Sequence, residues 1–133
     1  NISLVYGKQD RSTIFEEGFH AGQDIFYNEQ GKGNQTPLQT EVEAKIAKAY
    51  SGEKDEYGWM KSNEVKNYFD EVKTGSVSKE TQKTFNKFVT DVVAKDVYKV
   101  YKDTWEKEGV DMEANSPKNY TPSFDYTKEK VKQ

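Results

Sequence analysis

Residues 12–28 read STIFEEGFHAGQDIFYN, and this stretch predicts the helix around which the chain is organised. Thr13 is expected to cap that helix, because Glu16 follows three residues later and completes a capping box. At about 100° per residue, one face gathers apolar side chains and two glycines, namely Ile14, Phe15, Gly18, Phe19, Gly22, Ile25 and Phe26. We predict that this face is buried, and that its glycines allow another element to pack closely against the backbone.

The opposite face of the same helix carries the only histidine of the chain. Glu16, His20, Gln23 and Tyr27 lie together there. Because Glu16 and His20 are four residues apart, their side chains can reach one point above the helix. A lone histidine is also common as a surface or half-buried side chain that hydrogen-bonds a neighbour, here Tyr27 or Glu16. Both interpretations stay open at this point.

Residues 15–23, FEEGFHAGQ, resemble the His-Glu-x-x-His helix of zinc metallopeptidases, in the form that continues as HAxQ in bacterial zincins. On that pattern His20 matches the second metal-binding histidine and Glu17 matches the general base. Glu16 stands where the first histidine belongs. The resemblance therefore implies a zincin-like domain whose motif has become degenerate.

The stretch 40–44, TEVEA, is similar to the second helix of gluzincins, in which a glutamate supplies the third metal ligand. Glu41 is the better match and Glu43 the alternative, and Lys45 stands where an aspartate usually follows. The resemblance covers roughly residues 14–50. It implies Glu16, His20 and Glu41 as metal ligands, with Glu17 as the base of an active enzyme. The residues alone also allow Glu41 and Glu43 to be solvated, since charged side chains are usually exposed.

A ligand set of one histidine and two carboxylates changes what a bound metal can do. Two carboxylates neutralise the charge of a divalent ion, so the ion becomes a weaker Lewis acid and its bound water a weaker acid. Such a set suits manganese or iron about as well as zinc. Zinc or another divalent metal is therefore the expected cofactor if there is one, and peptidase activity is not expected.

Capping residues, namely Thr36 before Pro37, Ser62 and Ser78, together with 3.6-residue periodicity predict a mainly α-helical domain with helices near 13–28, 38–51, 62–73 and 79–108. Residues 2–6 alternate between apolar and polar, which predicts a minor N-terminal strand. Residues 1–110 are expected to form one helical domain, and 111–133 a tail partly packed on it through Tyr120, Phe124 and Tyr126. The predicted core includes Phe19, Phe88, Val92 and Trp105.

Composition narrows the class of protein. The chain has 133 residues, of which 33% are hydrophobic and 14% aromatic, so a small core must be built from few, large side chains. It has no cysteine, which excludes disulfides and thiol catalysis. Its net charge is −3, and its acidic and basic residues are mixed along the chain, which argues against nucleic-acid binding. No apolar run reaches the length of a membrane span.

The composition also bears on the location of the protein. A chain rich in Lys, Asn and Tyr fits a secreted or cell-surface bacterial protein, and it fits a cytoplasmic one too. The first residue is Asn1 and not Met, so we expect that residues were removed or not included.

Three hypotheses for function follow. The first is a degenerate zincin-like domain that serves as a binding or scaffold module for a protein or peptide partner. The second is an active metal-dependent hydrolase with a Glu/His/Glu site. The third is an unrelated helical protein-protein interaction domain that uses the long helix near 79–108. The first differs from the third in requiring Glu41 or Glu43 to face His20.

Overall fold

A computed structural model of the chain describes residues 11–31, 35–51, 55 and 57–124. Its helical elements, in chain order, are α2 (Arg11–Glu29), α3 (Pro37–Ser51), η1 (Trp59–Lys61), α4 (Asn63–Lys73), α5 (Lys79–Phe88), η2 (Val89–Val93), α6 (Ala94–Lys107) and η3 (Pro117–Asn119). The predicted mainly helical fold is confirmed, and each predicted helix is present within two residues of its expected bounds, the long one as α5, η2 and α6 in succession. No strand occurs in these ranges, and the strand predicted at 2–6 lies outside them.

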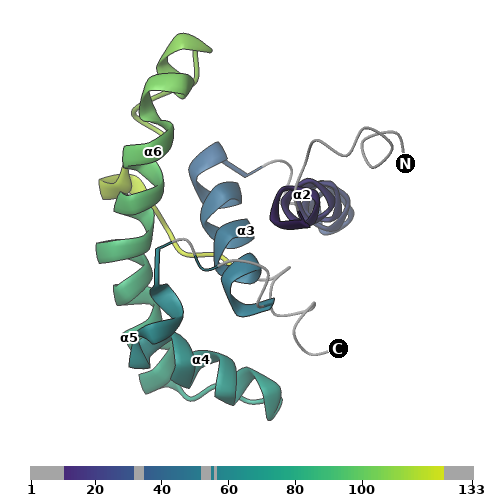
Figure 1. The fold of residues 1–133 in the computed structure, drawn as a ribbon, viewed down its shortest axis with the longest axis vertical. Coiled ribbons are helices and arrows are strands. Elements are labelled where there is room, and N and C mark those ends of the chain that lie inside the picture. The colour runs from purple at the N-terminus through teal and green to yellow at the C-terminus, as the bar shows by residue number, and fades with distance from the viewer. Residues whose placement is uncertain (1–10, 32–34, 52–54, 56, 125–133) are drawn as a thin grey trace.

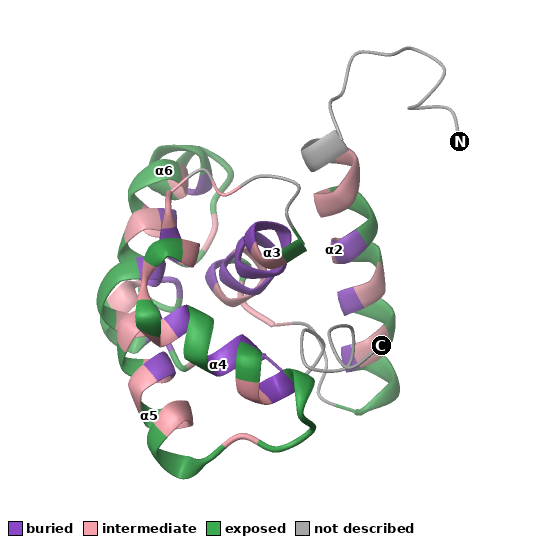
Figure 2. Ribbon diagram, turned by 60° about the horizontal axis from the view of Figure 1, so that its bottom comes forward, coloured by how far each residue is buried: buried purple, intermediate pink, exposed green. Residues whose placement is uncertain are grey.

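Helix α3 is the centre of the fold. Figure 1 shows α2 on one side of it and the long α5–α6 column on the other, with α4 beneath. Every residue from Val42 to Ala49 is buried, including charged ones, and Figure 2 shows α3 buried along most of its length. Its apolar stripe of Leu38, Val42 and Ile46 lies in the main core with residues of α4 and α6. Its Glu43, Lys45 and Lys48 contact α2. The helix is therefore covered on both sides.

The start of α3 is fixed by local and distant contacts. The backbone N–H of Gln39 donates to the Thr36 hydroxyl over 3.2 Å, and the Thr36 N–H donates to the Gln39 side chain over 3.3 Å, which is a capping box. The buried Asn115 accepts the Leu38 N–H at 2.9 Å. Thr36 with Pro37 was the predicted start, and the distant cap from Asn115 was not predictable from the local pattern.

Helix α2 packs on α3 with a face that only partly matches the one predicted: Phe19 is buried and Phe15 and Phe26 pack beside it, as predicted, but Gln23 and Tyr27 are buried as well. The helix begins at Arg11, so Thr13 lies inside it and is not the cap. Ile25 is 61% exposed, and Gly18 is exposed with no neighbouring atom within 4 Å of an added Cβ. The buried residues are Phe19, Gln23 and Tyr27. The prediction placed Gln23 and Tyr27 opposite the buried face, but both side chains are buried because Glu43 of α3 accepts hydrogen bonds from them.

The long helix contains a π-helical segment at Val89–Val93. Val89 and Val93 are fully buried whereas Val92 is 36% exposed, so the predicted core place of Val92 was wrong. Phe88 is half-buried and packs against the core, which confirms its predicted place in part. A π-helical segment adds a residue to one helical turn. The buried face is therefore shifted by one residue, so that Val93 is buried in place of Val92. Trp105 is buried as predicted.

The main apolar core lies between α3, α4, α5 and α6. It consists of Leu38, Val42, Ile46, Trp59, Val65, Tyr68, Phe69, Val72, Phe85, Val89, Val93, Ala94, Val97, Trp105, Tyr120 and Phe124. Tyr120 and Phe124 carry the segment after α6 back onto this core, and Tyr126 lies outside the described residues. None of the described helices is both long enough and apolar enough to cross a membrane.

Candidate metal centre

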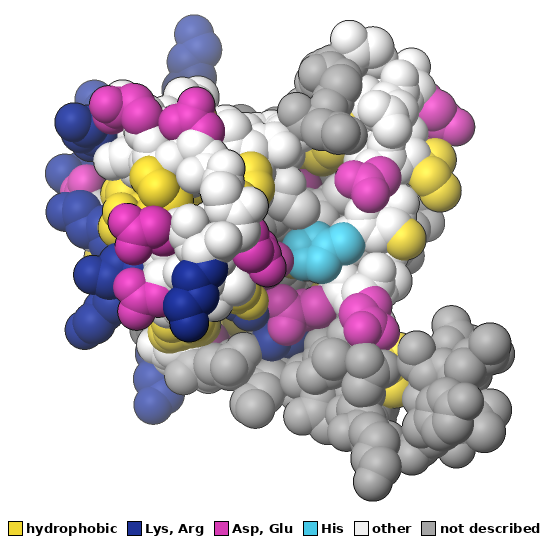
Figure 3. Space-filling view, turned by 90° about the horizontal axis from the view of Figure 1, so that it is seen from above, with side chains coloured by type: hydrophobic (Ala, Val, Ile, Leu, Met, Phe, Trp, Pro, Cys, Tyr) yellow, Lys and Arg dark blue, Asp and Glu magenta, His cyan; other side chains and the backbone are white. Residues whose placement is uncertain are grey.

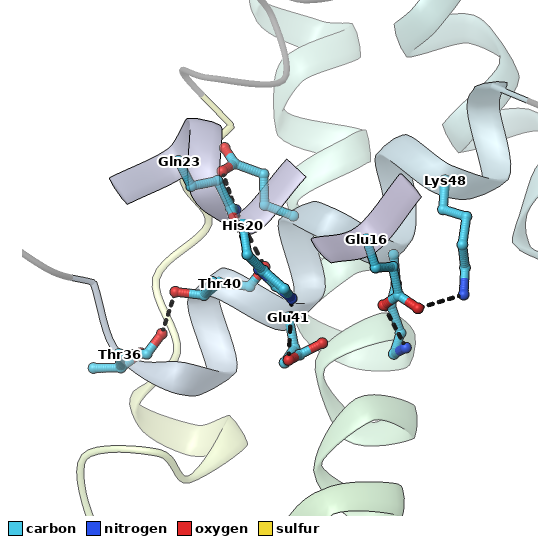
Figure 4. A network of polar contacts seen from close by, with 9 residues as sticks. Glu16, His20, Gln23, Thr36, Thr40, Glu41 and Lys48 are labelled. Carbon is cyan, nitrogen blue, oxygen red and sulfur yellow. Dashed lines mark hydrogen bonds and ion pairs between the residues drawn. The ribbon is translucent and has the colours of Figure 1, made fainter. Parts of the chain in front are cut away.

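The predicted ligands come together where α2 crosses α3. One side-chain ligand atom from each of Glu16, His20 and Glu41 lies within 4.8 Å of the others, and all three residues are half-buried. Glu16 and His20 are one turn apart on α2, and Glu41 faces them from the second turn of α3 (Figure 4). The two motifs singled out in the sequence are therefore neighbours in space.

Glu16 is held by two lysines of α3. Lys45 Nζ lies 2.9 Å from one carboxylate oxygen and Lys48 Nζ lies 2.8 Å from the other. The lysine side chains are only 6% and 3% exposed. Burial acts to raise the pKa of Glu16, but the hydrogen bonds and charges of the two lysines outweigh it and lower that pKa. Both oxygens of Glu16 are thus engaged by internal cations.

His20 is engaged at both ring nitrogens. Nδ1 lies 2.8 Å from Gln23 Oε1, and Nε2 lies 3.3 Å from a Glu41 oxygen. The Gln23 amide nitrogen donates to the Thr40 carbonyl and to Glu43, so its oxygen is the end that faces the ring. His20 therefore donates from Nδ1.

The other ring nitrogen then points a lone pair at a carboxylate unless it is protonated. The hydrogen bond with Glu41 accordingly raises the pKa of His20, against the opposing effect of burial. A protonated Nε2 has no lone pair for a metal. The contact with Glu41 therefore competes directly with metal binding.

Glu43, the alternative third ligand, has a different role. It is fully buried, and its oxygens accept from Gln23 Nε2 at 2.7 Å and from the Tyr27 hydroxyl at 2.8 Å. The expectation of a solvated carboxylate was wrong for Glu43, because α2 covers it with two donors. Glu43 does not belong to the group formed by Glu16, His20 and Glu41.

Glu17, the candidate base, is exposed on α2 and does not belong to that group either. A general base must lie within hydrogen-bond reach of the proton that it removes. With both carboxylate oxygens of Glu16 engaged by lysines and Glu17 on the exposed surface, the residues do not fit a zinc-peptidase centre.

The ion pairs that Lys45 and Lys48 form with Glu16 were not predicted from the sequence. The interpretation treated Lys45 only as a departure from the gluzincin pattern and did not consider Lys48. The signal that could have found them is their spacing, since two residues three apart share a helix face and Glu16 needed a counter-charge.

An open cleft of about 350 Å³ adjoins the centre and is lined by His20, Asp24, Gln35, Pro37, Thr40 and Glu41. In Figure 3 the histidine lies in a hollow with acidic side chains on both sides of it. Of the residues that line the cleft, only His20 and Glu41 were predicted as site residues. The cleft gives an outside molecule access to both of these residues.

Comparisons of the chain with protein-family models, with curated proteins and with solved structures found no match.

Proposed function

We propose that this chain is a non-catalytic binding module built on a zincin-like helix pair. The observation that carries the proposal is the double ion pair of Glu16, in which buried Lys45 and Lys48 engage both carboxylate oxygens. Two ammonium groups supply the positive charge that a metal supplies in an active site. The helix pair is thereby held together without a metal.

The pairing also fits the way in which the sequence departs from the zincin pattern. A metal-binding histidine usually donates its second ring N–H to a carboxylate that orients it. Here a carboxylate, Glu16, stands at the first histidine position, and a cation, Lys45, stands where the aspartate is expected. The two departures have opposite charge and contact each other at 2.9 Å. Together they support an exchange of a metal site for an ion pair.

Metal analysis of the untagged protein is the direct test, together with a peptidase assay on unstructured peptide mixtures. We expect substoichiometric zinc, manganese and iron after purification without chelator, and no cleavage above that of a His20→Ala control. Stoichiometric metal with cleavage that His20→Ala abolishes would contradict the proposal. That result would favour the hydrolase, the second candidate, which rests on the convergence of Glu16, His20 and Glu41 within 4.8 Å.

A restored site gives a sharper test of ancestry. Glu16→His alone leaves Lys45 and Lys48 beside the new imidazole, and their charge opposes zinc. We therefore expect Glu16→His/Lys45→Glu/Lys48→Gln to bind zinc more tightly than the parent chain in calorimetry, because it offers two imidazoles one turn apart and an orienting carboxylate. The matched control carries the two lysine changes without Glu16→His. Equal zinc affinity of the variant and this control counts against a zincin-like origin.

A further inference from the structure

The cleft beside His20 offers hydrogen-bond acceptors and almost no donors. Glu41 Oε1 and Gln35 Oε1 make no hydrogen bond within the described residues, and both atoms are shielded from solvent. The Asp24 carboxylate also lines the cleft and makes no hydrogen bond within the described part of the chain. The Thr40 hydroxyl donates its proton to the Thr36 carbonyl at 3.0 Å, which leaves its lone pairs available.

The donors near the cleft are already used inside the protein. His20 directs Nδ1 to Gln23 and Nε2 to Glu41, and the Gln35 amide nitrogen donates to Ser123 at 3.1 Å. None of the described residues that line the cleft is a lysine or an arginine. The nearest buried ammonium groups, those of Lys45 and Lys48, are engaged by Glu16.

The first turn of α3 does not make this cleft an anion site. Helix N-termini bind anions through free backbone N–H groups. Pro37 has no such group, and the N–H groups of Leu38, Gln39 and Thr40 donate to Asn115, to the Thr36 hydroxyl and to the Thr36 carbonyl. An incoming anion would meet Asp24 and Glu41 with no donor in compensation.

We propose that this cleft binds a positively charged side chain, arginine or lysine, of a partner polypeptide. The inference rests on the proposed binding module and names the chemistry of its ligand. A guanidinium group brings five donors and a positive charge, which complement the exposed Asp24 carboxylate and the Glu41 carboxylate, whose side chain is 20% exposed. The volume of about 350 Å³ admits a single long side chain with its solvation, and the open mouth lets the main chain of the partner stay outside.

The single histidine makes the test direct, because its imidazole NMR signals report on this cleft alone. The parent chain, in buffer with EDTA, is titrated with four probes: acetyl-Ala-Arg-Ala-amide, the same peptide with lysine, the same peptide with citrulline, and putrescine. Citrulline keeps the shape of arginine and removes its charge. We expect saturable shifts of the His20 signals with the arginine and lysine peptides, and binding at least about tenfold weaker with citrulline, since hydrogen bonds to charged groups are the stronger ones.

Two variants assign the binding to the cleft. Glu41→Gln is expected to weaken the arginine peptide about tenfold or more, and Asp24→Asn, on the exposed rim, by a few-fold. The matched control is Asp70→Asn, an exposed carboxylate of α4, which should bind as the parent does. Because Asp24 is exposed, its replacement tests the cleft even if Glu41→Gln weakens the fold.

The outcomes separate this inference from the proposed function. Equal binding of the arginine and citrulline peptides, or unchanged affinity in both cleft variants, overturns the cationic ligand while a metal-free, inactive chain still supports the binding module. Tight binding of putrescine without binding of the blocked peptides overturns the polypeptide partner. Stoichiometric metal with peptidase activity overturns the proposed function itself.

Discussion

The two sides of α3 are held by different forces. Towards α4, α5 and α6 it contributes to an apolar core in which Tyr68 and Phe85 stack with ring centroids 3.8 Å apart. Towards α2 the apolar cluster is small, formed by buried Phe19, Tyr27, Ala44 and Ala47 with Phe15 and Phe26 packed against it. The rest of that interface is polar or charged and almost fully paired. Apolar contacts tolerate small changes of position, whereas paired charges demand one register.

This difference assigns distinct roles to the two interfaces. The apolar side supplies most of the free energy of folding, because burial of apolar area is the dominant favourable contribution. The polar side fixes where α2 lies, and with it the position of His20 relative to Glu41. Damage to the first is expected to unfold the chain, and damage to the second to release α2.

The largest effect is expected in the apolar core. Phe85→Ala removes a fully buried ring that contacts Tyr68 and Phe124, and we expect a loss of about 3–5 kcal/mol in the free energy of unfolding. Chemical denaturation followed by circular dichroism measures it. Phe88→Ala, a half-buried ring three residues later, is the matched control and should cost clearly less. Equal losses for the two variants would mean that the buried face of the long helix is assigned incorrectly.

On the polar side, Glu16→Ala leaves two buried ammonium groups without their carboxylate. We expect a loss of about 2–4 kcal/mol, because breaking a buried ion pair from one side leaves uncompensated charge. The same thermodynamics predict a rescue. Glu16→Leu/Lys45→Met/Lys48→Met removes all three charges together and should be more stable than Glu16→Ala. If the triple variant is the less stable of the two, the ion pairs of Glu16 contribute net stability and do more than offset the cost of burying their own charges.

Glu43 offers a finer test of the same side. Glu43→Gln keeps the shape of the side chain but replaces one acceptor oxygen by a donor, which conflicts with donation from Gln23 or Tyr27. We expect a loss of about 1–2 kcal/mol, with faster hydrogen exchange confined to α2. Uniformly faster exchange across α5 and α6 as well would show that α2 does not open independently.

The two sides also differ in how far the sequence predicted them. The helices and the starts at Thr36, Ser62 and Ser78 follow from local chemistry, since Ser62 and Ser78 accept the N–H groups of Val65 and Thr81. The proximity of Glu16 and His20 followed from their spacing on one helix, and that of Glu41 was implied by the resemblance to zincins. These features depend on residues close in sequence or on a known pattern.

What could not be predicted depends on partners distant in sequence. Gln23 and Tyr27 look solvent-facing until Glu43 is placed opposite them, and Lys45 and Lys48 look exposed until Glu16 is placed between them. The π-helical segment at Val89–Val93 shifts the buried face of a helix whose periodicity otherwise appears regular. Hydrophobic patterning cannot identify a buried face that is built from pairs of polar residues.

The smallest expected effect is the response of the α2–α3 interface to pH. The hydrogen bond with Glu41 raises the pKa of His20 above its ordinary value of 6.5. A group whose pKa is higher in the folded state stabilises that state fully below the unfolded pKa. Its contribution is lost as the pH rises through the folded pKa. Stability should therefore decline from about pH 6.5 upward, by less than about 1 kcal/mol because the pair is partly exposed.

The contribution of His20 to this decline is obtained by subtracting the pH profile of a variant without the imidazole from that of the parent chain. Urea denaturation is measured at intervals from pH 5.5 to 8.5 for the parent and for His20→Gln, which keeps a hydrogen-bonding side chain but cannot titrate. Subtraction of the variant profile removes the contribution of every other titrating group. An NMR titration of the single imidazole gives the folded pKa directly. A folded pKa below 6.5, or an identical pH profile for the two chains, means that Glu41 does not hold the protonated ring, and with it fails the argument that this contact competes with a metal.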